Sequence, residues 1–94
     1  MKPLLDVLVI LDALEKEGSF AAASAKLYKT PSALSYTVQK LESDLNIQIL
    51  DRTGHRARFT RTGQMLLEKG RDVLHTVREL EKQAVKLHQG WENE

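Results

Sequence analysis

The stretch GSFAAASAKLYKTPSALSYTVQKLESDL, residues 18–45, decides the fold because it holds two helix starts. Ser19 is a favoured N-cap and predicts a short helix over residues 20–27, whose alanines let another helix come close. Thr30 and Pro31 predict a second helix, because threonine caps well and proline needs no N–H at the first helical position. Two helices joined by a short turn therefore stand at the centre of the chain.

The second helix has two chemically different faces. Leu34, Val38, Leu41 and Leu45 recur at helical spacing and are expected to be core, and Asn46 is the expected end of the helix. The opposite face carries Ser32, Ser35, Tyr36, Gln39, Lys40 and Ser43. Short polar side chains on an otherwise anchored helix suit entry into a DNA major groove, which is about 12 Å wide. The pattern therefore indicates a helix-turn-helix.

The flanking segments predict a helix before this pair and a hairpin after it. Residues 4–17 carry a helical stripe of Leu4, Leu8, Leu11 and Leu14, and Gly18 is expected to stop that helix. Residues 47–60 alternate between apolar and polar residues around the turn signal Thr53-Gly54-His55. This segment, here called the wing, is expected to form two short strands.

A long final helix is predicted from a cap at Thr60 or Thr62 to about Gln89, with Gly90 as its end. Its apolar residues follow a spacing of three and four, with Gly70 in the same row. We call this set the C-terminal stripe: Leu66, Val73, Val77, Leu80, Ala84 and Leu87. Because so long a helix outruns a small core, the stripe is expected to pair with a second copy of the chain. The alternative is packing on its own domain alone.

Composition narrows the class of protein. The 94 residues carry a net charge of only +1, yet the segments 24–41 and 52–61 contain lysines or arginines and no acid. Such segments can present a positive face on a neutral protein. The absence of cysteine excludes disulfides and thiolate sites, and fits a reducing compartment such as the cytoplasm. The longest apolar run is too short for a signal peptide or a membrane span.

The motifs resemble the LysR-type family of bacterial transcriptional regulators. The resemblance covers residues 4 to 90 and is carried by GSFAAAS at 18–24, TPSALSY at 30–36, QKLE at 39–42 and LDRTG at 50–54. It implies a mainly α fold, a winged helix-turn-helix of three helices and a two-stranded wing, followed by a long dimerisation helix. It also implies sequence-specific binding of double-stranded DNA at an inverted-repeat operator.

The resemblance further implies which residues contact DNA. The helix opening at Thr30 enters the major groove, and the wing approaches the backbone or the minor groove. The expected DNA-binding residues are Lys29, Thr30, Pro31, Ser32, Ser35, Tyr36, Lys40, Arg52, Arg56 and Arg58. Many family members have Gln-Pro in place of Pro31-Ser32, and arginine in place of Tyr36, so the preferred base pairs are expected to differ. Arg52 could instead form an ion pair with a helix acid.

The expected organisation has three parts: a DNA-binding domain over residues 1–60, a linker helix over 61–89, and the start of a hinge at 90–94. The hinge would lead to a larger C-terminal domain, absent here, that binds a small-molecule effector. The resemblance implies a homodimer, with a tetramer as the alternative for the longer protein. No cofactor, metal or membrane partner is expected.

Two other classes of function fit the sequence less well. A helical protein–protein adaptor would use the long helix, but it has no reason to keep an acid-free wing. An enzyme is disfavoured because neither a nucleophile set nor a Gly-rich phosphate loop is present. His55, His75 and His88 are too scattered to share a metal ion.

Overall fold

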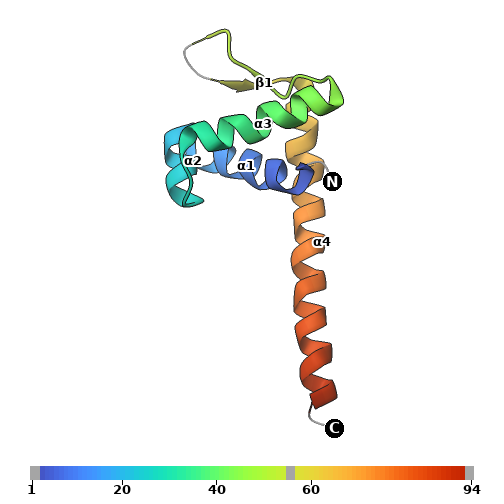
Figure 1. Ribbon diagram of the computed structural model, residues 1–94. Helices are drawn as coiled ribbons and strands as arrows, with labels where there is room; N and C mark the ends of the chain where they lie inside the picture. Colours follow the sequence, from blue (N-terminus) through green and yellow to red (C-terminus); the bar gives the residue numbers. More distant parts are fainter. Residues whose placement is uncertain (1–2, 55–56, 93–94) are drawn as a thin grey trace.

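The computed structural model describes residues 3–54 and 57–92, with the side chains of residues 91 and 92 excepted. A small body of three helices and a hairpin lies beside the first half of a long helix, whose second half extends away alone (Figure 1). The elements of the described chain are α1 (Leu4–Glu17), α2 (Phe20–Lys26), α3 (Pro31–Leu45), β1 (Leu50–Asp51), β2 (Arg58–Phe59) and α4 (Arg61–Glu92). The expected winged helix-turn-helix with an appended helix is confirmed.

Local capping explains where α1 ends and where α2 and α3 begin. Gly18 ends α1 with a φ of 87°, a left-handed conformation that glycine adopts without strain. The hydroxyl of Ser19 accepts the N–H of Ala22 at 3.1 Å and starts α2. The hydroxyl of Thr30 likewise accepts the N–H of Ala33 at 3.1 Å and starts α3. These caps are the ones the sequence predicts.

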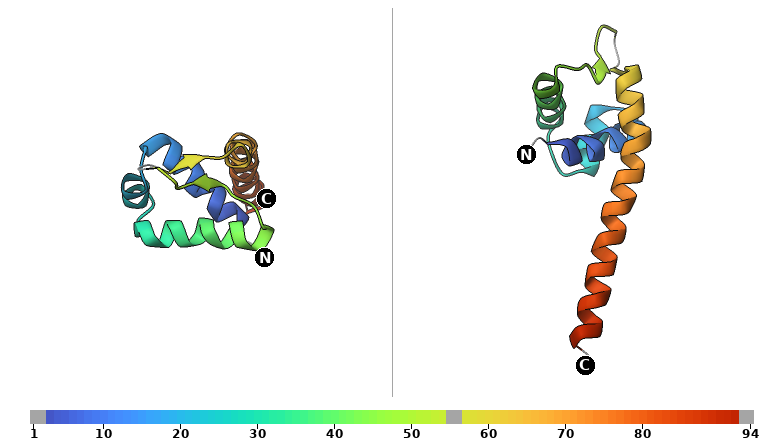
Figure 2. Two further views of the ribbon diagram at one scale, coloured as in Figure 1. Left: turned by 90° about the horizontal axis from the view of Figure 1, so that it is seen from above. Right: turned by 90° about the vertical axis from the view of Figure 1, so that its right-hand side faces the viewer.

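The core lies where α1, α3 and β1 meet. Leu11, Leu34, Leu41 and Ile49 are fully buried there, and α1 lies between α3 and α4 (Figure 2). Burying such side chains is the main stabilising contribution in a small domain.

Two expected core residues are not buried. Leu45 is 39 % exposed because it is the last residue of α3, and Ile47 packs against the core after the chain turns. Leu4 is 41 % exposed in the first turn of α1, so the buried face of α1 is centred on Val7 and Leu11 instead.

The wing is a minimal antiparallel hairpin. Leu50 pairs with Phe59 and Asp51 pairs with Arg58. The carboxylate of Glu42 on α3 accepts the backbone N–H groups of Ile49 and Leu50 at 2.7 and 3.2 Å. These two hydrogen bonds attach the start of the wing directly to α3.

Two glycines let α4 pack closely on the body. Thr60, not Thr62, caps the helix by accepting the N–H of Gly63 at 3.0 Å. A Cβ on Gly63 would collide with the backbone carbonyl of Ile49, and a Cβ on Gly70 would lie 2.6 Å from a methyl group of Leu8. Gly70 therefore belongs to the contact with α1, and its assignment to the C-terminal stripe is wrong.

The end of α4 also differs from expectation. The helix runs through Gly90 to Glu92. Glycine in a helix interior costs about 1 kcal/mol relative to alanine, but it keeps its N–H and does not stop a helix as proline does. Gly90 is therefore part of the helix and not its end.

Candidate nucleic-acid interface

The polar face of α3 points away from the body. Leu34, Val38 and Leu41 are buried on the inner side and fix the rotation of the helix. Ser32 and Tyr36 are exposed on the outer side, Tyr36 to 67 %. Because the inner side chains set this orientation, exposed outer side chains such as Ser32 and Tyr36 can meet a partner.

The first turn of α3 concentrates hydroxyl groups. Thr30 and Pro31 are exposed, and the hydroxyl oxygens of Thr30 and Ser32 lie 3.3 Å apart in a hydrogen bond. The N-terminus of a helix carries a partial positive charge, which favours a nearby phosphate. This end of α3 therefore combines exposed hydroxyl groups with a partial positive charge, which together favour an anionic partner.

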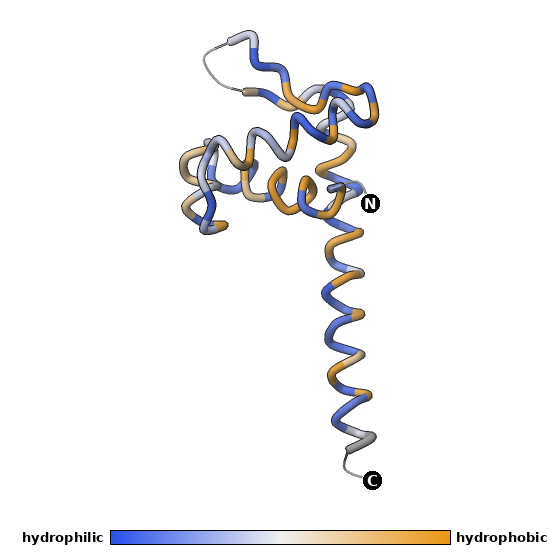
Figure 3. Tube along the Cα trace, viewed as in Figure 1, coloured by the Kyte–Doolittle hydropathy of each residue, from blue (hydrophilic) through white to orange (hydrophobic). Residues whose placement is uncertain are grey.

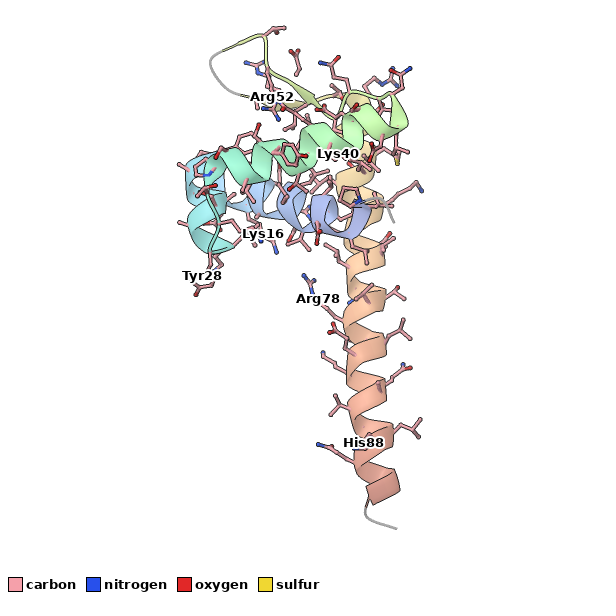
Figure 4. The ribbon with its side chains drawn as sticks, in the orientation of Figure 1. Lys16, Tyr28, Lys40, Arg52, Arg78 and His88 are labelled. Carbon is pink, nitrogen blue, oxygen red and sulfur yellow. The ribbon has the colours of Figure 1, made fainter. Side chains whose placement is uncertain are left out.

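Arg52 links the wing to both helices of the helix-turn-helix. Its guanidinium Nη1 donates a hydrogen bond of 2.5 Å to Ser35 Oγ, and its Cζ lies 5.3 Å from the centroid of the Phe20 ring. Figure 4 shows the Arg52 side chain in the space between the wing and α3. The expected alternative, an ion pair with a helix acid, is wrong among the described residues, because a hydroxyl and a ring hold this arginine instead.

The lysines have different surroundings. Lys40 lies on the polar face of α3 and forms an ion pair with Asp44 at 3.2 Å, one helical turn further on. Lys29 is exposed in the turn between α2 and α3, next to Tyr28, which has a positive φ of 56°. A surface ion pair such as that of Lys40 is worth little, so DNA could compete for this lysine.

On the wing, Arg58 is exposed on β2, across from Asp51. The backbone N–H and the hydroxyl of Thr53 donate to the carboxylate of Asp51 at 3.0 and 2.8 Å. These hydrogen bonds hold the pKa of Asp51 below its ordinary value, and the charge of Arg58 adds to the effect. The expected contact Arg56 lies outside the described residues, as does His55 in the turn of the wing.

The C-terminal stripe divides between two surroundings. Leu66 packs against the body together with the buried Leu67 and Leu74. Further along α4, Leu80 is 60 % and Leu87 is 78 % exposed, and apolar positions alternate with polar ones down the extended half (Figure 3).

Helical geometry separates these two faces of α4. At 3.6 residues per turn, the row Gly63, Leu67, Gly70 and Leu74 and the C-terminal stripe lie roughly 90° apart around the helix. The body covers the first row, and nothing in the described chain covers the far part of the stripe.

The sequence did not reveal two of the contacts that shape this surface. Glu42 appeared only as part of a motif, although its carboxylate holds β1. Asp12 receives hydrogen bonds or ion pairs from Arg71 at 2.9 Å and from Lys16 at 3.1 Å. The Lys16 spacing is a helical signal, whereas Arg71 is 59 residues away and has none.

Other kinds of site find no support in the part of the chain that is described. Within residues 3–54 and 57–92, no three potential metal ligands come together. Over the same residues, no helix combines the length and the apolar character needed to cross a membrane.

Comparison with known proteins places this geometry in context. A family model described as "Bacterial regulatory helix-turn-helix protein, lysR family" matches residues 5–64. The uncharacterized HTH-type transcriptional regulator YeeY of Escherichia coli K12 is 90 % identical over 94 residues, which is all of this chain and 30 % of that protein. The probable HTH-type transcriptional regulator YhaJ of the same strain is 50 % identical over 88 residues, covering 94 % of this chain and 30 % of that protein.

Among solved structures, the BenM DNA-binding domain in complex with catB site 1 DNA superimposes with a TM-score of 0.83 at 28 % identity. That match covers 92 % of each chain. The chain spans 30 % of the length of the two curated relatives.

Proposed function

The chain belongs to the lysR family of bacterial regulatory helix-turn-helix proteins, and from this premise we propose that it binds double-stranded DNA sequence-specifically, as a homodimer, to regulate transcription. The observation that carries the proposal is the orientation of α3, whose Leu34, Val38 and Leu41 are buried while its outer face, with Ser32 and Tyr36, is exposed beside the wing. The BenM domain, which shares the fold, was solved with DNA. This function places the protein in the bacterial cytoplasm, where the DNA is, and requires no enzymatic activity.

In this proposal, α3 enters the major groove. Ser32, Ser35 and Tyr36 read base edges, and Thr30 and Pro31 lie at the backbone near the helix start. Lys29, Lys40 and the wing arginines at 52, 56 and 58 contact phosphates or the minor groove. Phosphate contacts supply most of the affinity, and base contacts supply the sequence preference.

The exposed part of the C-terminal stripe is proposed to pair with the same stripe of a second chain. Two-fold symmetry of the protein would then match an inverted repeat in the operator. Residues 1–60 would form the reading domain and residues 61–89 the pairing helix, which residues 90–92 continue. The approach to a hinge would then lie after this helix. Sensing of a small molecule is proposed to belong to the part of such regulators that this chain does not match.

The test is a binding titration. An operator is first selected from a random DNA pool, and its affinity is compared with that of shuffled DNA by fluorescence anisotropy at about 50 and 200 mM salt. We expect tighter binding to the operator at both salts, and a steep loss of affinity as salt rises. Equal affinity for the two DNAs at both salts would contradict the proposal.

A charge reversal separates DNA binding from the adaptor hypothesis. Arg58→Glu should weaken operator binding and lower the salt dependence by about one phosphate contact, a slope change of roughly 0.9. Arg78→Glu is the matched control, because Arg78 lies on α4 away from α3 and the wing (Figure 4). An adaptor that uses only the long helix would tolerate the change at Arg58.

A further inference from the structure

Arg52 is held on two sides by the helices that it touches. The ring of Phe20, the first residue of α2, lies under the guanidinium, and Ser35 of α3 accepts its hydrogen bond. The carboxylate of Glu42 attaches the backbone at Leu50, two residues before Arg52, to α3. The guanidinium therefore has a defined place between the wing and the N-terminal part of α3.

The chemistry of this pair fixes the direction of the hydrogen bond. A guanidinium carries only donors, so Ser35 Oγ must be the acceptor. A serine hydroxyl has one hydrogen and two lone pairs, so Ser35 keeps its hydrogen for another partner. Within the described residues, no acceptor takes that hydrogen.

The hydroxyl of Thr37, also on α3, is used differently from that of Ser35. Thr37 donates its hydrogen to the carbonyl oxygen of Ala33 at 3.0 Å, one turn back along the helix. Such a bond is the usual local use of a hydroxyl within a helix. Ser35 is instead engaged as an acceptor by Arg52, and its side chain is only half-buried.

We propose that Arg52 is a positioning residue that holds the Ser35 hydroxyl as a hydrogen-bond donor toward an acceptor on DNA. The inference rests on the proposed function and deepens it by stating which partner donates in one hydrogen bond: Ser35 donates and the DNA accepts. In the major groove the acceptors are N7 of the purines, O6 of guanine and O4 of thymine, whereas the amino groups of adenine and cytosine are donors. Phosphate oxygens are acceptors of the same kind, so the contact can lie at a base edge or at the backbone.

The first experiment compares the effect of Arg52→Met in two backgrounds. Operator affinity is measured for the unaltered chain, Arg52→Met, Ser35→Ala and the double variant. Arg58→Met alone and with Ser35→Ala is the control, because it removes the same charge from an arginine that does not touch Ser35. We expect Ser35→Ala to weaken operator binding about tenfold, in line with the loss of one good hydrogen bond.

If Arg52 acts through Ser35, Arg52→Met weakens binding about tenfold more in the Ser35 background than in the Ser35→Ala background. Arg58→Met should have the same fold effect in both. Arg52→Lys, which keeps a charge and a donor, should recover part of the affinity lost in Arg52→Met, and only where Ser35 is present. An effect of Arg52→Met that is equal in the two backgrounds would overturn the inference.

The second experiment identifies the acceptor. Operators are prepared with base analogues that each lack one acceptor: 7-deazapurines for N7, 2-aminopurine for guanine O6 and 5-methylpyrimidin-2-one for thymine O4. Methylphosphonates remove the charged phosphate oxygen. A substitution that weakens the unaltered chain but not Ser35→Ala supports the inference and shows whether the acceptor is a base or a phosphate. If no substitution separates the two proteins, Ser35 donates to neither.

Thermal unfolding of every variant shows that binding is compared between folded proteins. If Arg52→Met does not fold, Arg52→Lys takes its place in the same comparison, with Arg58→Lys as its control. Equal affinity of the unaltered chain for operator and shuffled DNA would overturn the proposed function together with this inference. Clear discrimination without coupling between Arg52 and Ser35 would overturn the inference alone.

Discussion

Asp12 on α1 forms an ion pair with Arg71 on α4 and so ties the two helices together by charge. Burial of its carboxylate, which is only 14 % exposed, raises its pKa, but the hydrogen bonds and charges of Arg71 and Lys16 outweigh burial. The pKa of Asp12 in the folded chain is therefore below its ordinary value of 3.8. A lowered folded pKa means that the contribution to stability is complete above the unfolded pKa and is lost as the pH falls through the folded pKa.

We therefore expect Asp12→Asn to destabilise the chain by about 1 kcal/mol at pH 7. The difference from the unaltered chain should shrink as the pH falls below the unfolded value of about 3.9, and it should be lost once the pH passes the lowered folded pKa, as the carboxylate becomes protonated. Urea unfolding across this pH range measures it. Asp72→Asn on the exposed face of α4 is the control and should change little at any pH. A difference for Asp12→Asn that stays the same from pH 7 to the most acidic pH at which both chains still fold would show that charge is not the cause.

Gly63 is required by the close contact between the start of α4 and β1. Gly63→Ala would place a methyl group against the carbonyl of Ile49, which is backbone and cannot rotate away. We expect a loss of about 1 to 3 kcal/mol in the free energy of unfolding, as for other overpacked sites. Gly90→Ala is the matched control, since a Cβ there meets nothing within 4 Å and the helix should gain up to about 1 kcal/mol. Equal melting temperatures for the two variants would contradict this.

At the scale of elements, Glu42 joins α3 to the wing. Its carboxylate accepts two backbone N–H groups, and Glu42→Ala would leave both without that partner. We expect a loss of about 1 to 3 kcal/mol and faster hydrogen exchange at the amides of Ile49 and Leu50. Arg52 directly follows β1, so loosening β1 should also displace Arg52. Discrimination between operator and shuffled DNA should therefore fall as well.

Glu42→Gln keeps one oxygen acceptor and should give an intermediate result in both measurements. Glu81→Ala, at an exposed position on α4, controls for the loss of a negative charge. If the two amides exchange in Glu42→Ala as slowly as in the unaltered chain, another contact must hold the wing.

At the scale of the whole molecule, α4 determines how two chains could meet. The helix extends well beyond the body, and the longest dimension of the molecule is 59 Å against 26 and 21 Å for the others. Its far half exposes Leu80 and Leu87 on one side. Exposed apolar rows of this kind are costly in water unless a partner covers them.

We expect the chain to be a dimer at micromolar concentration and Leu80→Asp with Leu87→Asp to be a monomer, as measured by sedimentation equilibrium. The charged side chains would be buried in the pairing face, at a cost of several kcal/mol. Gln89→Asp adds one negative charge, half that of the double substitution, at an exposed position on roughly the opposite side of α4 and should leave the dimer intact. A dimer that persists in the double variant would show that another surface of the chain forms the dimer.

The helices of the reading domain could be predicted from the sequence because their signals are local. Ser19 and Thr30 each cap an N–H three residues away, and Gly18 and Asn46 adopt left-handed conformations at helix ends. The polar face of α3 followed from the spacing of Leu34, Val38 and Leu41 for the same reason. Interactions within one turn of a helix depend only on the neighbouring residues.

Tertiary packing alone determined the rotation of α4 and the partners of Asp12 and Arg52. The periodicity of α4 could not show that Gly70 and Leu74 face α1 while Leu80 faces outward, because the rotation of a helix is set by what it packs against. The partners of Asp12 and Arg52 likewise depended on the fold, since Arg71 and Ser35 come close only when distant segments meet. Contacts between residues far apart in the chain form through the shared core, and no local pattern encodes them.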